Sequence, residues 1–224
     1  MERVLCLVMG YVFGLFQTGY LYSRSKHMDI RNYGSGNSGS TNVLRVMGKK
    51  AGLIVFLGDA GKMIAACLIT RVLFRSQPEL LYVYLLYTGF GVILGHNFPF
   101  YMEFKGGKGI AASAGLLAST DWRVMLVCLV VFVAAVAITR YVSLGSILVM
   151  ICFFIGMVFF GARGDFGIGA AHLTEFYVLA GLISAMGIWR HHTKIKRLLS
   201  RRLGLRVCIA ASRERPSGDG MVCL

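Results

Sequence analysis

Residues Gly95 to Gly115 read GHNFPFYMEFKGGKGIAASAG, a polar, glycine-rich segment that leads into a new apolar run. Its centre sets two lysines among three glycines: Lys105, Gly106, Gly107, Lys108 and Gly109. Residues that lack a Cβ let backbone N–H groups approach an oxyanion closely, and a helix that begins there adds the positive end of its dipole. The stretch therefore predicts a phosphate-binding loop at the start of a helix.

The composition of the chain indicates what surrounds this loop. Of its 224 residues, 56% are hydrophobic and only 15% are charged, and the mean hydropathy is +0.67. These values lie outside the usual range of soluble domains and indicate an integral membrane protein. The net charge of +14 is large, but the basic residues lie in short loops beside apolar segments. The lipid bilayer is therefore the expected partner, and nucleic acid is not.

Seven apolar segments predict an all-α polytopic membrane protein with about seven transmembrane helices. They cover residues 4–22, 51–74, 79–94, 110–119, 123–139, 141–160 and 176–189. A helix needs about 20 apolar residues to cross the hydrocarbon core, so the fourth segment is short. Fusing or omitting short segments would leave five helices. The first segment lacks a cleavage signal and is expected to be an uncleaved span, in which Gly10 and Gly14 would let another helix approach closely.

The distribution of lysine and arginine predicts the orientation, because both accumulate in cytoplasmic loops. With seven spans, one side receives residues 23–50, the 95–109 loop, Arg140 and the chain from Arg190 onward, which contain eighteen of these residues. The other side receives five: Arg3, Arg71, Arg75, Arg123 and Arg163. The polar loops and the C-terminus are therefore expected in the cytoplasm, and the N-terminus is expected outside.

Residues 23–50 form a second polar region and contain six Lys or Arg residues. Residues 34–42 within it read GSGNSGSTN and are flanked by Arg31 and Arg45. A flexible linker is one interpretation of this composition. The asparagines and flanking arginines exceed what a linker needs, so the alternative is a site for a phosphorylated polyol, built from hydroxyls, amides and a guanidinium group.

Two ionisable residues, Asp59 and Lys62, lie inside the second apolar segment. Charges at such depth are costly, so these residues are functional candidates by default. Three residues apart, they share one helix face. Either they form a purely structural ion pair, or Asp59 orients a basic side chain or a substrate hydroxyl near the membrane boundary.

The cysteines predict neither a metal site nor a disulfide framework. Six are present, without a C-x-x-C spacing or a His–Cys cluster. Four of them lie inside apolar segments and are expected to fill the core: Cys6, Cys67, Cys128 and Cys152.

Two long motifs resemble those of a known family. Residues 34–45, GSGNSGSTNVLR, resemble the first motif of the bacterial acyl-phosphate:glycerol-3-phosphate acyltransferases, the PlsY family, and residues 95–109 resemble the second. Shorter matches follow the family's order: Gly19-Tyr-Leu, Asp29-Ile-Arg31, Asp59-x-x-Lys62 and Arg140-Tyr-Val-Ser143. The resemblance covers roughly residues 10–200, and both long motifs are specific.

The resemblance implies a multi-pass enzyme of the cell inner membrane whose active site faces the cytoplasm. Members of the family move a fatty acyl group from acyl phosphate to the 1-hydroxyl of sn-glycerol 3-phosphate, which gives lysophosphatidic acid and phosphate in the first acylation step of phospholipid synthesis. They use no cofactor and no metal. A functional link to an enzyme that forms acyl phosphate is also implied. Two phosphate-bearing substrates agree with two polar loops.

The family's important serine and arginine in the first motif fall on Ser35 and Arg45, which, with Asn42, would hold glycerol 3-phosphate. Lys105, Lys108 and nearby backbone N–H groups would bind acyl phosphate and stabilise the departing phosphate. The catalytic candidates are Ser35, His96 and Lys105. The substrate-binding candidates are Gly34, Gly36, Asn37, Thr41, Asn42, Arg45, Asp59, Gly106, Gly107, Lys108, Gly109 and His191. The third motif supplies the weaker ones, which are Arg190, His191 and Lys194.

The role of His96 stays open at this stage. It is either the base for the attacking hydroxyl or a structural hydrogen-bonding residue. Because an acyl phosphate is already activated, positioning can suffice, and the donor's own phosphate can accept the proton. On that hypothesis, His96→Gln keeps substantial activity.

The C-terminal part departs from the family pattern. Lys194 stands where the third motif carries an asparagine, and Ser200-Arg-Arg202 replaces a stretch like Gly-Thr-Glu. Residues 1–200 are expected to form one membrane domain, and residues 201–224 a basic, disordered tail. Most basic residues after Trp189 are expected to attract anionic lipid headgroups.

Two other classes of function remain as alternatives. A transporter or channel for an anionic phosphorylated metabolite would also use basic glycine-rich loops and an intramembrane Asp–Lys pair. No inverted repeat is visible, and both polar loops are predicted on one side of the membrane. A non-catalytic membrane scaffold would fit the hydropathy but leaves both loops unexplained.

Overall fold

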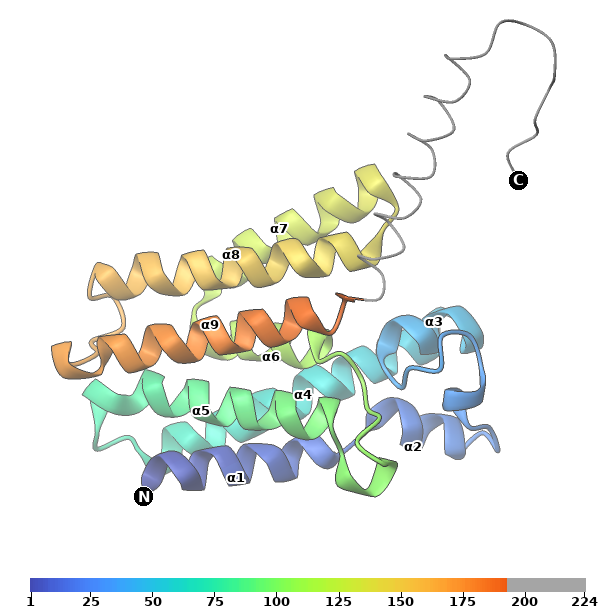
Figure 1. Ribbon diagram of the computed structural model, residues 1–224, viewed down its shortest axis with the longest axis horizontal. Helices are drawn as coiled ribbons and strands as arrows, with labels where there is room; N and C mark the ends of the chain where they lie inside the picture. Colours follow the sequence, from blue (N-terminus) through green and yellow to red (C-terminus); the bar gives the residue numbers. More distant parts are fainter. Residues whose placement is uncertain (193–224) are drawn as a thin grey trace, which may run out of the picture.

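The computed structural model describes residues 1–192 and is built from helices over that range (Figure 1). The predictions for Lys194 and for the tail of residues 201–224 lie outside the described residues. The nine α-helices within residues 1–192 are α1 (Glu2–Leu15), α2 (Thr18–Arg24), α3 (Ser40–Met47), α4 (Lys49–Leu73), α5 (Pro78–Asn97), α6 (Ile110–Thr120), α7 (Trp122–Thr139), α8 (Val142–Ala162) and α9 (Leu173–Trp189). Three short 3₁₀ turns accompany them: η1 (Ile30–Asn32), η2 (Phe100–Met102) and η3 (Ala170–His172).

Each of the seven predicted apolar segments corresponds to a helix or to a helix pair. Six segments of the described chain are long and apolar enough to cross a membrane by length and composition: residues 2–24, 49–73, 78–102, 122–139, 142–162 and 170–189. The exception is α6, which has 11 residues and is about 16 Å long, against a hydrocarbon core of about 30 Å. The all-helical, membrane-spanning architecture is confirmed, and the number of crossings stays a prediction.

The first predicted span is interrupted between α1 and α2. Phe16 adopts an extended conformation with φ −68° and ψ 100°, so the helical hydrogen-bond pattern stops there. The break is held by Gln17, a buried residue whose amide Nε2 donates to the carbonyl oxygens of Gly14 (3.2 Å) and His96 (2.9 Å). Its Oε1 accepts a hydrogen bond from the Ser38 hydroxyl at 3.3 Å. The buried Gln17 amide thus donates to the Gly14 carbonyl at the break and to the His96 carbonyl of α5.

Helices α1 and α5 pack so closely that side chains are excluded between them. A Cβ at Gly10 would overlap the carbonyl oxygen of Thr88, and a Cβ at Gly91 would overlap that of Leu7. Gly14 and Gly95 meet in the same way one turn further along. The predicted close approach at Gly10 and Gly14 is confirmed, and its partner is a second pair of glycines four residues apart on α5.

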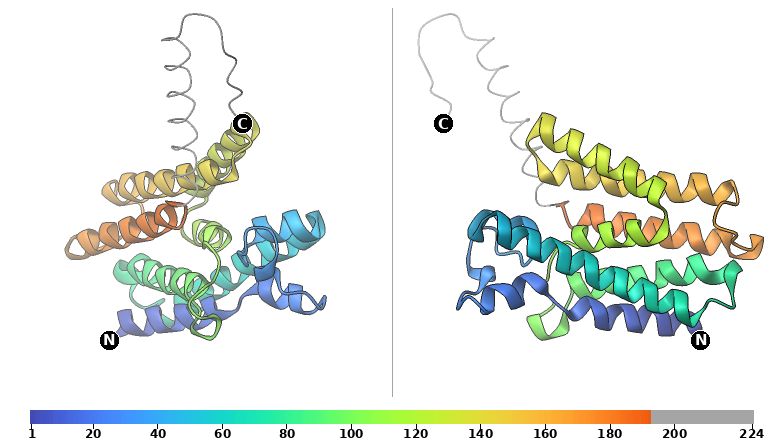
Figure 2. Two further views of the ribbon diagram at one scale, coloured as in Figure 1. Left: turned by 45° about the vertical axis from the view of Figure 1, so that its right-hand side comes forward. Right: turned by 180° about the vertical axis from the view of Figure 1, so that it is seen from behind.

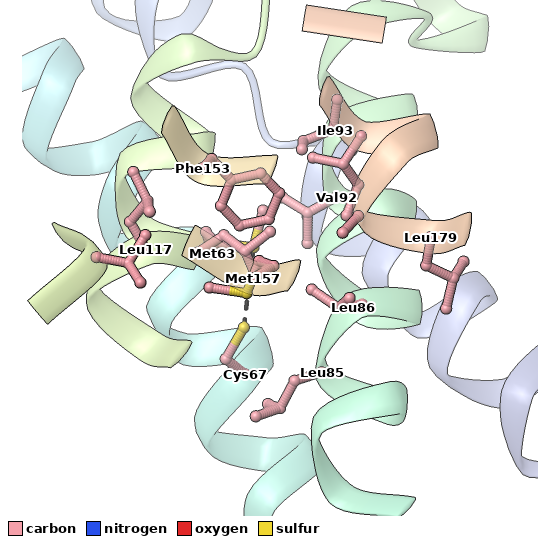
Figure 3. Packing of buried hydrophobic residues seen from close by; sticks show 14 of the residues in the cluster. Met63, Cys67, Leu85, Leu86, Val92, Ile93, Leu117, Phe153, Met157 and Leu179 are labelled. Atoms are coloured by element: carbon pink, nitrogen blue, oxygen red, sulfur yellow. Dashed lines mark hydrogen bonds between the residues drawn. The ribbon is translucent and has the colours of Figure 1, made fainter. Parts of the chain in front are cut away.

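The apolar core lies between α4, α5, α6, α7, α8 and α9, and Figure 3 shows part of it. Met63 and Cys67 of α4 face Leu85 and Leu86 of α5, and the Cys67 thiol approaches the Met63 sulfur at 3.9 Å. The four cysteines of the described apolar segments are free thiols, of which Cys6, Cys67 and Cys128 are buried, as expected for core-filling residues.

The polar loops gather at one end of the bundle (Figures 1 and 2). The region between α2 and α4, the loop between α5 and α6, the turn between α7 and α8 and the C-terminal end of α9 all lie there. The N-terminus and the connections α4–α5 and α8–α9 lie at the opposite end, where the Gly169 N–H donates to the Glu79 carbonyl. The predicted meeting of the two polar loops is therefore observed.

Candidate active site

The first polar loop is held in shape by a buried amide. Asn42, at the start of α3, accepts a hydrogen bond from the Ser35 N–H at 2.9 Å and donates to the Tyr33 carbonyl at 3.0 Å. Gly34 has φ +60°, a conformation that favours glycine, and a Cβ there would overlap the Asn42 oxygen. The Asn42 side chain thus braces the loop, and the substrate contact expected of it from the sequence stays a prediction.

The start of the same loop is fixed by an ion pair. The Arg31 guanidinium binds the Asp29 carboxylate at 2.8 Å and lies 4.9 Å from the centre of the Tyr20 ring. The hydrogen bonds from Arg31 lower the pKa of Asp29 to about 2, so this carboxylate stays ionised near neutral pH. The loop is therefore an ordered part of the protein, which argues against the flexible-linker interpretation.

The second loop folds back onto the C-terminal end of α5. The N–H groups of Gly106 and Gly107 donate to the carbonyl oxygens of Asn97 (3.1 Å) and His96 (3.0 Å). Main-chain N–H groups around the two lysines are expected from the sequence to bind a phosphate, but those of Gly106 and Gly107 close the loop instead. Glycine is required here because a Cβ at Gly106 would overlap the His96 carbonyl oxygen.

The carbonyl groups of this loop connect it to the rest of the site. The Asn37 amide of the first loop donates to the Gly106 carbonyl at 3.2 Å. The Arg190 guanidinium, just after α9, donates to the Gly107 carbonyl at 2.6 Å and to that of Gly106 at 3.3 Å. Two residues thus join three distant parts of the sequence around one loop.

The positive end of α6 follows this loop. Gly109 caps the helix in the left-handed conformation, with φ +78°. Within residues 1–192, the N–H groups of Gly109, Ile110 and Ala111 have no backbone acceptor. These groups, rather than those of Gly106 and Gly107, are the main-chain donors available to an anion.

His191 lies beside this loop and is almost completely buried. Neither ring nitrogen of His191 has a hydrogen-bond partner among residues 1–192. The positive charges of Lys108 and Arg190 interact electrostatically with the ring. Burial, followed by these two positive charges, lowers the pKa of His191 to about 4 from the ordinary 6.5. His191 is therefore neutral at physiological pH, with one donor and one acceptor nitrogen to offer.

Four predicted site residues are exposed on the same end of the molecule: Ser35, Thr41, Arg45 and Lys105. Lys105 forms an exposed ion pair with Glu103 at 2.8 Å. Arg45, on α3, has neither a hydrogen bond nor an ion pair within residues 1–192. Gly36, with φ +70°, is also exposed and lies in the first polar loop beside Ser35. The structure brings these residues to one end of the bundle, where Thr41 and Arg45, four residues apart, share one face of α3.

A buried polar cluster lies beneath the second loop. The Lys62 ammonium is 3.1 Å from the Asp59 carboxylate and 2.9 Å from Nδ1 of His96. Asp59 also accepts a hydrogen bond from the Thr18 hydroxyl at 3.0 Å. Asp59 and His96 are therefore brought together, with Lys62 between them.

Sequence reasoning missed two residues of the site, Gln17 and Asn97. Gln17 is the only amide side chain within residues 4–22, and this isolated polar group in an apolar span was an available signal. Asn97 is fully buried, with both amide atoms unpartnered in the described chain, and its oxygen lies close to Gly109. Its position in the second motif was visible, but its burial depends on how α5 and α6 pack.

Within residues 1–192, no group of three or more His, Cys, Asp or Glu side chains lies close enough to hold a metal ion. The cationic groups of the site are lysine and arginine side chains, which can bind phosphate oxygens.

Sequence comparison relates the chain to one family. A family profile described as glycerol-3-phosphate acyltransferase matches residues 4–201. The glycerol-3-phosphate acyltransferase of Clostridioides difficile (strain 630) is 39% identical over 200 residues, which cover 88% of this chain and 92% of that protein. The glycerol-3-phosphate acyltransferase of Thermoanaerobacter sp. (strain X514) is 34% identical over 202 residues, which cover 89% and 93%.

Two solved structures of PlsY (YgiH), an integral membrane glycerol 3-phosphate acyltransferase, share the fold. The glycerol 3-phosphate form has a TM-score of 0.76 and 33% identity, and the lysophosphatidic acid form has 0.75 and 32%. Each comparison covers 90% of this chain and 94% of the other. With its long apolar helices, the chain is a multi-pass integral membrane protein, and it belongs to the glycerol-3-phosphate acyltransferase family.

Proposed function

We propose that this protein transfers a fatty acyl group from acyl phosphate to the 1-hydroxyl of sn-glycerol 3-phosphate. The observation that carries the proposal is the junction of the two polar loops, in which Asn37 and Arg190 both bind the carbonyl of Gly106. The similar PlsY structures in a glycerol 3-phosphate form and a lysophosphatidic acid form support the same acceptor and product. An apolar bundle beneath the junction suits the acyl chain.

The first loop is the proposed site for glycerol 3-phosphate. Arg45 is exposed and has no partner within residues 1–192 that competes for its guanidinium group. Such a group can bind a phosphate through two parallel hydrogen bonds. The hydroxyls of Ser35 and Thr41, also exposed, supply further donors, while Asn42 keeps the loop in position.

The second loop and the start of α6 are the proposed site for the phosphate of the donor. Lys108 lies at the junction with His191, and the main-chain donors at the start of α6 follow it directly. Lys105 can leave its exposed ion pair with Glu103 at little cost, because surface pairs of this kind contribute weakly to stability. Two lysines and a helix N-terminus would stabilise the charge on the departing phosphate.

The chemical step requires one bond to form and one to break. The hydroxyl oxygen of the acceptor attacks the acyl carbonyl carbon, and the bond from that carbon to the phosphate oxygen breaks. The proton of the hydroxyl passes to an oxygen of the departing phosphate, so that the products are lysophosphatidic acid and hydrogen phosphate. Because acyl phosphate is already activated, the protein contributes chiefly by positioning and by charge stabilisation.

The proposed topology has seven crossings, with the N-terminus outside and the active site in the cytoplasm. It is supported by the gathering of the basic loops at one end of the bundle, opposite the N-terminus (Figure 1). In this arrangement α6 crosses as the shortest helix. The location would be the cell inner membrane, where an enzyme that forms acyl phosphate supplies the donor.

One assay tests the proposed function. Purified protein in detergent is mixed with glycerol 3-phosphate and palmitoyl phosphate, and both lysophosphatidic acid and free phosphate are measured. We expect the two products in equal amounts. Phosphate release without lysophosphatidic acid, or no reaction with intact protein, would contradict the proposal.

A further inference from the structure

The ammonium group of Lys62 lies inside the bundle among hydrogen-bond acceptors. Four of them surround Nζ: the carbonyl oxygens of Phe16 (2.5 Å) and Gly14 (3.3 Å), the Asp59 carboxylate (3.1 Å) and Nδ1 of His96 (2.9 Å). The two carbonyl groups come from the break between α1 and α2, where no helical N–H takes them up. The break therefore supplies part of the negative environment that a buried ammonium needs.

This environment requires that Lys62 is charged. A neutral amine would leave the Asp59 carboxylate, which is 1% exposed, with only the His96 ring, whose Nδ1 lies 3.7 Å away, as a counter-charge, whereas the Lys62 ammonium is closer at 3.1 Å. The shorter contact assigns the positive charge to Lys62, because burying an unbalanced charge is strongly unfavourable. An ammonium group has three N–H donors and no lone pair. It can only donate to Nδ1 of His96, so that this nitrogen must act as an acceptor.

The proton of His96 is then placed by elimination. A doubly protonated ring would set two cations 2.9 Å apart, which the geometry disfavours. A neutral imidazole carries one proton, and with Nδ1 accepting, that proton is on Nε2. A Cβ at Gly107 would overlap Nε2, so this nitrogen faces the second loop directly.

We propose that Lys62 fixes His96 in the tautomer that carries its proton on Nε2, so that His96 serves the second loop as a hydrogen-bond donor to phosphate and not as a base. The donor role rests on the proposed function. His96 becomes a catalytic residue that touches the departing phosphate, and Lys62 becomes a positioning residue that acts through it. The proton of the attacking hydroxyl then has to leave by the phosphate itself.

The tautomer can be measured without any activity. The protein has five histidines, all of which are labelled with ¹⁵N. The signals of His96 are those that are missing from the spectrum of His96→Gln. We expect His96 at pH 7 as a neutral ring with its proton on Nε2, and we expect the Nε2 signal to shift when inorganic phosphate is added. A proton on Nδ1, or a doubly protonated ring, overturns the assignment, and an Nε2 signal that ignores phosphate overturns the donor role.

The part played by Lys62 is tested with two variants. Lys62→Met alone would leave the buried negative charge of Asp59 without its ammonium partner. The informative variant is therefore the double substitution Asp59→Asn with Lys62→Met, which removes both charges. We expect it to fold and to lose the single Nε2–H tautomer. Thr18→Val is the matched control, because it removes another hydrogen bond to Asp59 without touching His96. A double variant that keeps the wild-type tautomer overturns the role of Lys62.

The enzymatic activities of two His96 variants distinguish a hydrogen-bond donor from a general base at this position. Glutamine offers an N–H near the position of Nε2 and cannot act as a base, whereas glutamate can accept a proton and cannot donate when ionised. We expect His96→Gln to stay within about tenfold of wild-type kcat and His96→Glu to lose about 100-fold or more, the usual cost of removing such a donor. The reverse order overturns the proposal. If the wild-type protein itself makes no lysophosphatidic acid, the proposed function fails, while the tautomer measurement still decides the role of Lys62.

Discussion

The two lysines of the second loop have different surroundings. The Lys105 side chain is exposed and held by Glu103, whereas Lys108 is partly buried and interacts electrostatically with His191. Glu103 has φ +53°, in the left-handed region that non-glycine residues rarely adopt. This unfavourable backbone conformation positions Glu103 for its ion pair with Lys105. In the proposed function, Glu103 holds the Lys105 side chain until a phosphate binds.

We expect Lys105→Met to raise the KM for one phosphate substrate by about 10- to 100-fold, the range for a lost hydrogen bond to a charged group. Glu103→Gln should change the same KM by at most about fivefold, and downward, because Lys105 no longer has a competing partner. Steady-state kinetics with each substrate varied in turn would check both values. An unchanged KM for both substrates in Lys105→Met would show that this lysine does not bind phosphate.

The buried neutral state of His191 predicts how stability depends on pH. The folded pKa is about 4 and the ordinary value is 6.5, so between these values the unfolded chain binds the additional proton. Stability is therefore full above about pH 6.5 and falls as the pH is lowered toward 4, by up to about 3 kcal/mol. Thermal unfolding in detergent from pH 7.5 to 4.5 would measure this slope.

His191→Gln should reduce that slope, since glutamine does not titrate; the buried neutral His96 still contributes to what remains. His192→Gln is the control: His192 is exposed and stacks on Trp189, so its replacement should leave the pH dependence as in wild type. Asp29 contributes little in this window, because both its folded pKa of about 2 and its ordinary pKa of 3.8 lie below it. Equal slopes in wild type and His191→Gln would contradict the assigned pKa.

Among the helices, the contact between α1 and α5 sets the position of the whole site. The paired glycines bring the two backbones together, and this places the break after α1 beside the C-terminal end of α5. Gln17 then reaches the His96 carbonyl, and the carbonyl groups of Gly14 and Phe16 reach Lys62. The close packing is thus the support of the buried polar cluster.

Gly91→Ala should disturb this contact, because its Cβ would overlap the Leu7 carbonyl oxygen. We expect a loss of roughly 1–3 kcal/mol, which corresponds to a fall of about 2–12 °C in Tm for a chain of this size. Gly61→Ala on α4 is the matched control, since a Cβ there meets nothing within 4 Å. Its Tm should be unchanged or slightly higher, because alanine favours helix. Similar losses in both variants would refute the packing argument.

The molecule as a whole separates its two ends by charge and by structure. One end carries the polar loops and the site, and the other carries short connections (Figure 2). At that other end, Arg3 of α1 forms an ion pair with Glu175 of α9. Since basic loops stay in the cytoplasm, the site end should face inward.

Single cysteines test this orientation in a variant whose six native cysteines are replaced. Ser25 and Ser76 are both exposed and lie at opposite ends of the bundle, so Ser25→Cys and Ser76→Cys report on the two sides. With a membrane-impermeant maleimide on intact cells, we expect Ser76→Cys to react and Ser25→Cys to react only after the membrane is opened. Labelling of Ser25→Cys in intact cells, with or without labelling of Ser76→Cys, would contradict the proposed orientation.

The linear order of residues was sufficient to predict the helical segments, the two polar loops and most residue types of the site. These features are local: a run of apolar side chains partitions into lipid wherever it occurs, and a glycine-lysine loop remains polar in any fold. The grouping of basic loops on one side followed as well, because alternating spans return every second loop to the same side.

The pairing of donors with acceptors depended on the folded bundle. Lys62 meets His96 from 34 residues away, Asn37 meets Gly106 from 69, and Arg190 meets Gly107 from 83. The use of the Gly106 and Gly107 N–H groups for loop closure, and the break that leaves Gly14 and Phe16 carbonyls for Lys62, could not be read from the motifs. Hydrogen bonds are short and directional, so their partners depend on the positions of the packed helices to within a fraction of an ångström. Hydrophobic patterning specifies only which segments are buried.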